Sequence, residues 1–195
     1  SFNEDVFISG DLSLNGTLSV GGDALINEIT VGRGNGDPLI TFTNTAIGNE
    51  ALKSNTFGRF NTATGLKALR DNTTGIDNTA YGVQTLLQNT TGEKNTVVGS
   101  NALFANTTGS HNTAIGPSSL FTNTTGDQNT AIGSIALRDN ITGQYNTAIG
   151  GTAGLNNKDG SNNTFIGYGT NIDPTNASWN NSTALGYDAK ITKSD

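Results

Sequence analysis

Few side chains in this sequence could carry out acid–base or metal chemistry. The 195 residues include one histidine, His111, and no cysteine. A zinc site of histidine and thiolate ligands therefore lacks its donors, and most general acid–base schemes lack their usual proton carrier. The carboxylates Asp71, Asp77, Asp127 and Asp139 are spread along the chain, so a glycosidase-like carboxylate pair is not indicated either. We expect no enzyme activity, no cofactor and no metal site.

The charge balance argues against nucleic acids and membranes as partners. The formal net charge is −6, and the 10 lysines and arginines are scattered along the chain. Phosphate backbones and anionic bilayers are bound through clusters of basic residues. No apolar run approaches the roughly 18 residues of a membrane span. We therefore expect neither nucleic-acid binding nor membrane insertion.

An internal repeat of 17 residues organises the side chains that remain. The unit reads Asn-Thr-Ala-Ile-Gly-x-x-Ala-Leu-x-x-Asn-Thr-Thr-Gly-x-x, and seven consecutive intervals pass without an insertion. Its first residue is Asn44, Asn61, Asn78, Asn95, Asn112, Asn129, Asn146 and Asn163. Self-similarity at a fixed short period is typical of a solenoid, in which each repeat contacts only its neighbours.

Each repeat is expected to form one short strand and one tight bend. The position of Ile115 is β-branched or aromatic in most copies, which favours a strand. The Ala-Leu segment that follows lies among good helix formers, and Pro117 stands where a first helical turn tolerates proline. Strands pair at about 4.8 Å, whereas helix axes need about 8 to 10 Å. A stack therefore leaves room for at most one helical turn per repeat.

The thin apolar content predicts stacking of repeats and association of chains. Each repeat offers three or four apolar side chains, typically Ala, Ile, Ala and Leu, too few to offset its ordering entropy alone. Stacking would create apolar columns of Ile and Leu, and ladders of Asn and Thr that hydrogen-bond from repeat to repeat. Burial per residue stays low even then, and a closed homotrimer would raise it without long exposed edges. The predicted fold is mainly β, with a parallel β-solenoid or β-roll head.

Changes in the period of the residue pattern divide the chain into four segments. Before the array, apolar pairs recur every six residues between glycines. This pattern predicts a shaft of short intertwined strands, with a plain stack of hairpins as the alternative. The shaft, a connector, the array of 17-residue repeats and a divergent terminal repeat or cap comprise residues 1–31, 32–43, 44–167 and 168–195.

The terminal repeat holds the candidate ligand-binding residues. Gly167 and Gly186 occupy the same position of the repeat. They are 19 residues apart instead of 17. An aromatic face can stack on a sugar ring, and carboxylate or amide groups can bond its hydroxyls. A terminal repeat that departs from the consensus is also typical of a cap, so both interpretations are kept. The candidate residues are Tyr168, Asp173, Trp179 and Asn180.

The loop before each strand contains two further features. Phe57 and Phe60 flank Gly58-Arg59 in the first repeat and predict an apolar plug between shaft and array. His111 occupies a position that other repeats fill with Asp, Lys, Gln or Tyr. The repeat therefore requires no particular residue at this position, and we expect His111 to be exposed.

The array resembles the repeats of trimeric phage tail-fibre proteins and of related trimeric bacterial surface adhesins. The resemblance covers about residues 44 to 186 and rests on two motifs, Thr-Ala-Ile-Gly and Asn-Thr-Thr-Gly. The first begins at Thr45, Thr113, Thr130 and Thr147, and the second at Asn72, Asn89, Asn106 and Asn123. It implies a homotrimeric, elongated, extracellular fibre or fibre tip, on a cell surface or a virion tail, that binds a cell-surface glycan or protein.

Two other functions remain open. The chain could be a structural spacer of a fibre whose recognition domain lies beyond residue 195. It could also bind ice, because the threonines that follow the repeated asparagines would form a regular column of hydroxyls suited to ordered water. These threonines are Thr45, Thr62, Thr79, Thr96, Thr113, Thr130, Thr147 and Thr164.

Overall fold

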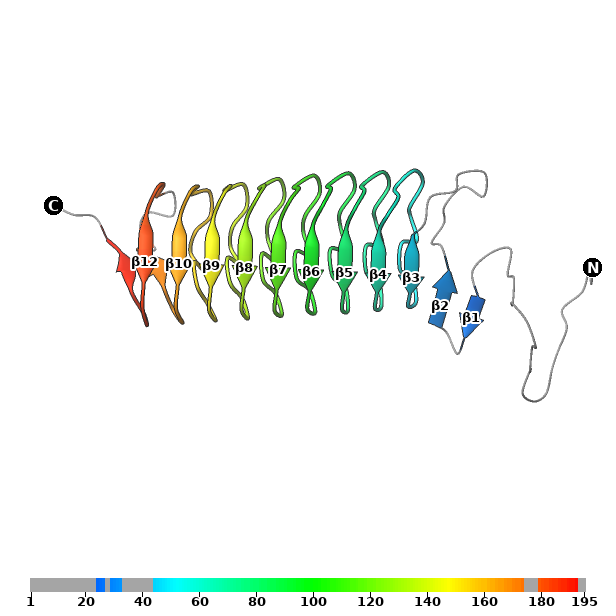
Figure 1. Cartoon of the computed structure of the whole chain (residues 1–195), viewed down its shortest axis with the longest axis horizontal. Coiled ribbons are helices and arrows are strands. Elements are labelled where there is room, and N and C mark those ends of the chain that lie inside the picture. Colours follow the sequence, from blue (N-terminus) through cyan, green and yellow to red (C-terminus); the bar gives the residue numbers. More distant parts are fainter. Residues whose placement is uncertain (1–23, 27–28, 33–43, 174–178, 193–195) are drawn as a thin grey trace, which may run out of the picture.

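The computed structural model shows a solenoid of stacked coils in a straight row (Figure 1). It describes residues 24–26, 29–32, 44–173 and 179–192. Most of the predicted shaft, residues 1–23, and most of the predicted connector, residues 33–43, lie outside the described residues. The interpretations of those two segments therefore stay predictions.

One long sheet runs along the solenoid, and each coil contributes one strand to it. The strands are neighbours in chain order, except that β12 directly follows β10. They are β1 (Ala24–Ile26), β2 (Ile29–Gly32), β3 (Thr45–Ile47), β4 (Thr62–Thr64), β5 (Thr79–Tyr81), β6 (Thr96–Val98), β7 (Thr113–Ile115), β8 (Thr130–Ile132), β9 (Thr147–Ile149), β10 (Thr164–Ile166) and β12 (Thr183–Leu185). A second sheet pairs β11 (Asn171–Ile172) with β13 (Lys190–Ile191).

The strands of the array pair in parallel, in register with the sequence repeat. Thr113 of β7 lies opposite Thr130 of β8, and the same register holds from β3 to β10. The longer terminal repeat keeps this register, because Thr164 lies opposite Thr183. At the other end, β1 and β2 form an antiparallel pair, and β2 pairs with the edge of β3. The prediction of a parallel β-solenoid with one short strand per 17 residues is confirmed.

The core is narrow and consists of columns of small and medium-sized side chains. The central residue of each strand is buried, and its two neighbours face outward. The inward column is Ala46, Ala63, Ala80, Val97, Ala114, Ala131, Ala148, Phe165 and Ala184. The predicted leucine column is confirmed as the second column of the same core and comprises Leu52, Leu69, Leu86, Leu103, Leu120 and Leu137.

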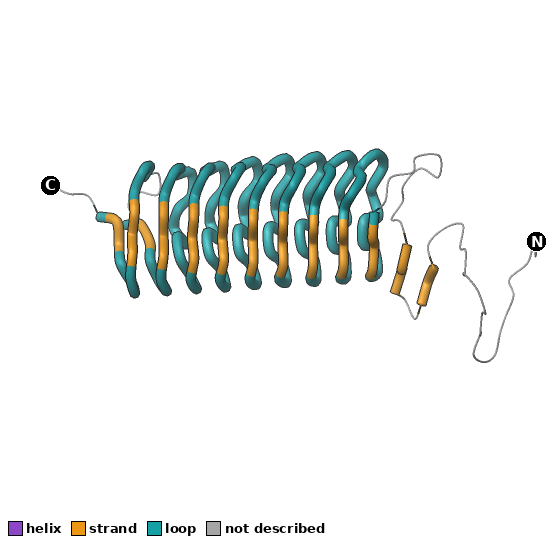
Figure 2. Tube along the Cα trace, viewed as in Figure 1, coloured by secondary structure: helices purple, strands orange, loops and turns teal. Residues whose placement is uncertain are grey.

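The segment after each strand is a run of turns. The single helical turn that the strand spacing left room for does not form, and the described residues contain no helix (Figure 2). Lys67 and Leu69 have φ of 58° and 50°, whereas a helix needs negative φ throughout. Their N–H groups donate to other coils, to the carbonyls of Asn49 (2.9 Å) and Thr85 (3.0 Å). The left-handed conformation costs about 1–2 kcal/mol, but burying leucine contributes about 1.5–3 kcal/mol. Core burial therefore outweighs the local preference.

Two columns of buried asparagines connect successive coils. The strand asparagines are the first residues of the repeats, each directly before a strand. The turn asparagines are Asn55, Asn72, Asn89, Asn106, Asn123, Asn140 and Asn157. The Nδ2 atoms of Asn112 and Asn123 both donate to the carbonyl of Gly126, at 2.8 and 3.0 Å. Oδ1 of Asn112 accepts the N–H of Asn129 at 3.0 Å. These bonds satisfy buried amides that would otherwise destabilise the core, and they confirm the predicted asparagine ladder.

The predicted threonine ladder is confirmed in the turns but not in the strands. Oγ1 of Thr90 donates to the carbonyl of Thr107 in the next coil at 2.9 Å, and Thr73, Thr107 and Thr124 do the same in their coils. Among the described residues, the hydroxyls of the strand threonines make no side-chain hydrogen bond of this kind. They point to the outer face of the sheet instead.

Two adjacent coils depart from the core pattern in ways that compensate. Gly154 stands where six coils have the buried leucine, and Phe165 stands in the column that is otherwise alanine or valine. A Cβ atom on Gly154 would lie 2.7 Å from Cδ2 of Phe165 and 2.9 Å from Cδ2 of Leu137. The phenylalanine ring therefore fills the volume that the glycine leaves, and packing stays dense.

Candidate functional site

The terminal coil places Tyr168 on the surface, in contact with a second tyrosine. Tyr168 follows β10 and Tyr187 follows β12, each after one glycine. Both side chains are exposed, and their rings stack with centroids 5.8 Å apart and planes 13° apart. In a stacked pair of this kind, each ring covers one face of the other.

Trp179 takes a structural position at the other end of β12. Its side chain is partly buried against the core cluster, and its indole Nε1 is the one buried side-chain nitrogen or oxygen of the described residues without a hydrogen-bond partner. Its carbonyl accepts Nδ2 of Asn163 at 2.6 Å. In the coil before, the carbonyl of Gly160 accepts Nδ2 of Asn146 in the same way. Trp179 thus continues the asparagine ladder and covers the last coil.

Asp173 and Asn180 are engaged in bonds between coils. The N–H of Asp173 donates to the carbonyl of Ile191 at 3.0 Å, beside the pairing of β11 with β13. Oδ1 of Asn180 accepts the N–H of Ser161 at 2.6 Å. The Asn180 amide oxygen is therefore already occupied by a backbone donor.

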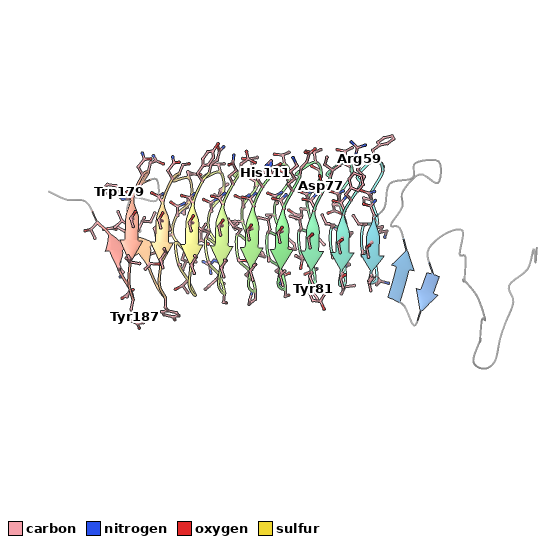
Figure 3. The ribbon with its side chains drawn as sticks, in the orientation of Figure 1. Arg59, Asp77, Tyr81, His111, Trp179 and Tyr187 are labelled. Carbon is pink, nitrogen blue, oxygen red and sulfur yellow. The ribbon has the colours of Figure 1, made fainter. Side chains whose placement is uncertain are left out.

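The structure does not bring the four candidate residues into one site. Trp179 and Tyr187 lie at opposite edges of the solenoid (Figure 3), and Tyr168 stacks on Tyr187. Asn180 adjoins Trp179 in sequence and lies at its edge. The sequence placed these residues in the terminal coil. It did not show that Tyr168 and Trp179 lie at opposite ends of the strands.

The outer face of the sheet is an uncharged surface that runs the length of the array. We define the outer sheet face as the outward residues of β3 to β10 and β12. It carries one column of threonines and one mainly apolar column, whose isoleucines and valine are 36% to 40% exposed and whose last member, Leu185, is 70% exposed. The apolar members are Ile47, Tyr81, Val98, Ile115, Ile132, Ile149, Ile166 and Leu185. The alternation of Thr and Ile around each buried Ala was the sequence signal for this face.

The loop before the strands does not contain the expected apolar plug. Phe57 and Phe60 are 65% and 53% exposed, and the guanidinium carbon of Arg59 lies 5.9 Å from the centroid of the Phe60 ring. Neither residue belongs to the buried core cluster, so the described residues do not form the predicted plug. Most of the shaft side of that junction lies outside the described residues. His111 is exposed, as expected.

The pKa of one surface carboxylate, Glu50, is lowered by a neighbouring lysine. Nζ of Lys53 donates to Oε1 of Glu50 at 2.7 Å, and this hydrogen bond lowers the pKa of Glu50 below its ordinary value of 4.5. A carboxylate with a lowered folded-state pKa adds stability above its unfolded pKa and loses it as the pH falls through the folded value.

Glu50→Gln is therefore expected to reduce the acid sensitivity of folding below about pH 4.5. The change in thermal midpoint at pH 7 should be small, because the ion pair is on the surface and screened by water. Thermal midpoints of both proteins between pH 3 and 7 check this. Parallel curves over the whole range would contradict it.

No metal centre or membrane span is found within the residues that the structure describes. They contain no group of three His, Cys, Asp or Glu side chains that could hold a metal ion. They also contain no helix with the length and apolar character that a bilayer crossing needs. No family model, curated protein or solved structure matches the chain.

Proposed function

We propose that this chain is part of a homotrimeric extracellular fibre that attaches to a ligand on a cell surface. The observation that carries the proposal is the apolar column of the outer sheet face. Every coil but one contributes an exposed apolar side chain to this column. The straight stack of coils supports a role that needs length along one axis (Figure 1). The resemblance of the repeats to tail-fibre and adhesin repeats supports it as well.

The outer sheet face suits association of identical chains. No outward residue of β3 to β10 or β12 is charged, so pairing two such faces would not bury an unpaired charge. Continuous apolar patches larger than a few hundred Å² are rare on monomers and mark interaction sites. Three identical rods with this face turned to a common axis would cover the apolar column and leave the loops outside.

Light scattering tests the trimer. The protein is expected to have a mass near three times 20.1 kDa. Ile115→Lys together with Ile132→Lys should yield monomers with an unchanged far-ultraviolet spectrum, because each adds a charge to the outer sheet face without touching the core. The matched control, Thr108→Lys with Thr125→Lys, places the same charges on exposed turn positions and should remain trimeric. A wild-type mass of 20.1 kDa would overturn the trimer.

Attachment would come from the surface that each chain leaves outside the trimer interface. The trimer carries three copies of this surface around one axis. Rigid multivalent display raises the effective concentration of weak sites and gives strong binding overall. Fluorescently labelled protein should bind saturably to whole bacterial cells and be displaced by unlabelled protein. If it binds none of a broad panel of cells, the spacer function replaces the attachment function.

The outer sheet face also favours one alternative function, ice binding. Its threonine column is exposed or half-exposed, regular, and free of side-chain hydrogen bonds within the described residues. This column lies beside the apolar column, so ice and a trimer would compete for the same face. Thermal hysteresis of a monomeric protein would support ice binding, and a trimer without hysteresis would exclude it.

A further inference from the structure

We propose that the coil containing β12 binds a neutral sugar ring on the exposed side chain of Tyr187. This inference rests on the proposed attachment function and gives it a location and a ligand class. Figure 3 shows Tyr187 beyond the end of β12, at the edge of the solenoid opposite Trp179. Neither Tyr187 nor Tyr168 belongs to the outer sheet face, so the proposed trimer contact requires neither of them.

Within the described residues, this is the one place where two exposed rings stack. Tyr168 and Tyr187 are the second residues after β10 and β12. The earlier coils carry no aromatic residue at this position, where they have Asn49, Leu66, Val83, Ser100, Pro117, Ser134 and Gly151. The other stacked pair of described residues, Phe104 and Phe121, is half-buried. The stack at Tyr187 is therefore a local departure from the repeat and not a property of every coil.

Contacts with the preceding coils hold the two rings in place. The ring planes of Tyr168 and Tyr187 are 13° apart, and their centroids are 5.8 Å apart. Tyr168 also lies against Gly151, where a Cβ atom would be 3.2 Å from Cδ2 and 3.3 Å from Cε2 of the ring. Because these contacts already restrict the Tyr187 ring, it loses little further freedom when a ligand stacks on it, and this favours binding.

The second face of the Tyr187 ring is open beyond the last described coil. Tyr168 covers the first face, yet the side chain is 81% exposed, the highest value of any large apolar side chain described. A Cβ atom on Gly167 would lie 2.5 Å from the carbonyl oxygen of Gly186, whereas a Cβ atom on Gly186 would have no described atom within 4 Å. No described residue therefore takes the next step along the axis, and a flat ligand can reach the ring.

Hydrogen-bond acceptors surround this open end. In the array, the carbonyl two residues after each strand accepts an N–H of the next coil, as that of Tyr168 does from Asp188 at 2.8 Å. Because β12 is the last strand of its sheet, the carbonyls of Leu185 and Tyr187 accept no hydrogen bond from a described residue. The carboxylate of Asp188 is exposed and forms none of the ion pairs of the described residues. A ligand at this end therefore has to bring hydrogen-bond donors and no anionic group.

These features fit a neutral sugar ring. A pyranose has apolar C–H groups on its ring faces and hydroxyl donors around its rim. One face can stack on the aromatic ring of Tyr187, while hydroxyls donate to the carbonyls of Leu185 and Tyr187. Cations are instead held in cages of several aromatic rings, whereas the two nearly parallel rings here enclose nothing. Acidic sugars and phosphates would be repelled by Asp188.

The test compares three variants with the wild type in the cell-binding assay. Tyr187→Ala removes the ring, and Tyr187→Phe keeps the ring without its hydroxyl. Phe57→Ala is the matched control, because Phe57 also carries an exposed ring, 65% exposed, but lies in the first repeat. Circular dichroism and light scattering should show all three variants folded and assembled as the wild type. Cells are used untreated or after periodate oxidation, which cleaves the vicinal diols of sugars.

Tyr187→Ala is expected to lose about tenfold in cell affinity, because the stacking contact disappears. Tyr187→Phe and Phe57→Ala should bind as the wild type does. Periodate treatment of the cells should abolish binding. Changing the salt concentration between about 0.05 and 0.5 M should leave the affinity unchanged, because a neutral ligand has no charge to screen.

Three results would each overturn this inference and leave the attachment function intact. They are wild-type affinity of Tyr187→Ala, binding that survives periodate, and an affinity that changes several-fold with salt. Binding that survives periodate would indicate a protein ligand, and a strong salt dependence would indicate a charged one. If the wild type binds no cells, the attachment function fails together with this inference.

Discussion

Asn106→Leu is expected to lower the free energy of unfolding by about 3 kcal/mol. Nδ2 of Asn106 donates to Oδ1 of Asn89 at 2.8 Å and to the carbonyl of Gly109 at 2.9 Å. Its Oδ1 accepts Nδ2 of Asn123 at 3.0 Å. All three asparagines are fully buried. Leucine has nearly the same shape but cannot bond, so Oδ1 of Asn89 loses its donor in the core.

Urea unfolding followed by circular dichroism, at one fixed protein concentration, measures the effect. Asn49→Leu is the control, because Asn49 is exposed and lies outside the two buried columns. That substitution should change the free energy of unfolding by less than about 0.5 kcal/mol. Equal effects of the two substitutions would show that the ladder contributes nothing beyond the apolar columns.

The same asparagine columns show why the period of the sequence predicted the fold so well. A residue type repeated every 17 positions lies directly above its own copy, as Thr113 lies opposite Thr130, so coil-to-coil contacts join like residues. The ladder and the strand register could therefore be predicted from the repeat alone. The antiparallel pairing of β2 with β3 could not, because β2 lies outside the repeat.

The left-handed conformation of the turn segment was not predicted, because local preference and tertiary burial disagree there. Ala102 and Leu103 are good helix formers, yet Leu103 has φ of 50° and is fully buried. The strand spacing limited this segment to at most one helical turn, but it did not predict the handedness of the turn. The left-handed leucines are stabilised by burial against neighbouring coils. The helix propensity of the residues in one repeat does not include this contribution.

The candidate site was predicted less completely than the fold. The sequence identified the terminal coil as divergent, but the separation of Tyr168 from Trp179 depends on which end of a strand each residue occupies. The exposure of Phe57 and Phe60 depends on the direction of a turn. The variety at the position of His111 was visible in the repeat, whereas its left-handed backbone appears only in the structure.

Phe165→Ala and Gly154→Leu are expected to destabilise the protein strongly alone and little together. Removing the Phe165 ring leaves a cavity and costs about 3–5 kcal/mol. Adding leucine at Gly154 places its Cβ 2.7 Å from that ring, an overpacking that costs about 1–3 kcal/mol or more. The double variant restores the pattern of Leu137 and Ala148. Its backbone tolerates leucine, because φ is 65° at Gly154 and 49° at Leu137.

A double-mutant cycle in urea measures the coupling. The double variant should unfold within about 1 kcal/mol of the wild type, so the interaction energy between the two positions should exceed 2 kcal/mol in magnitude, as for residues that share one volume. Independent core sites would add instead, and the double variant would then be the least stable of the four proteins. Such additivity would mean that the ring does not fill the space beside Gly154, and that the last coils are held by other contacts.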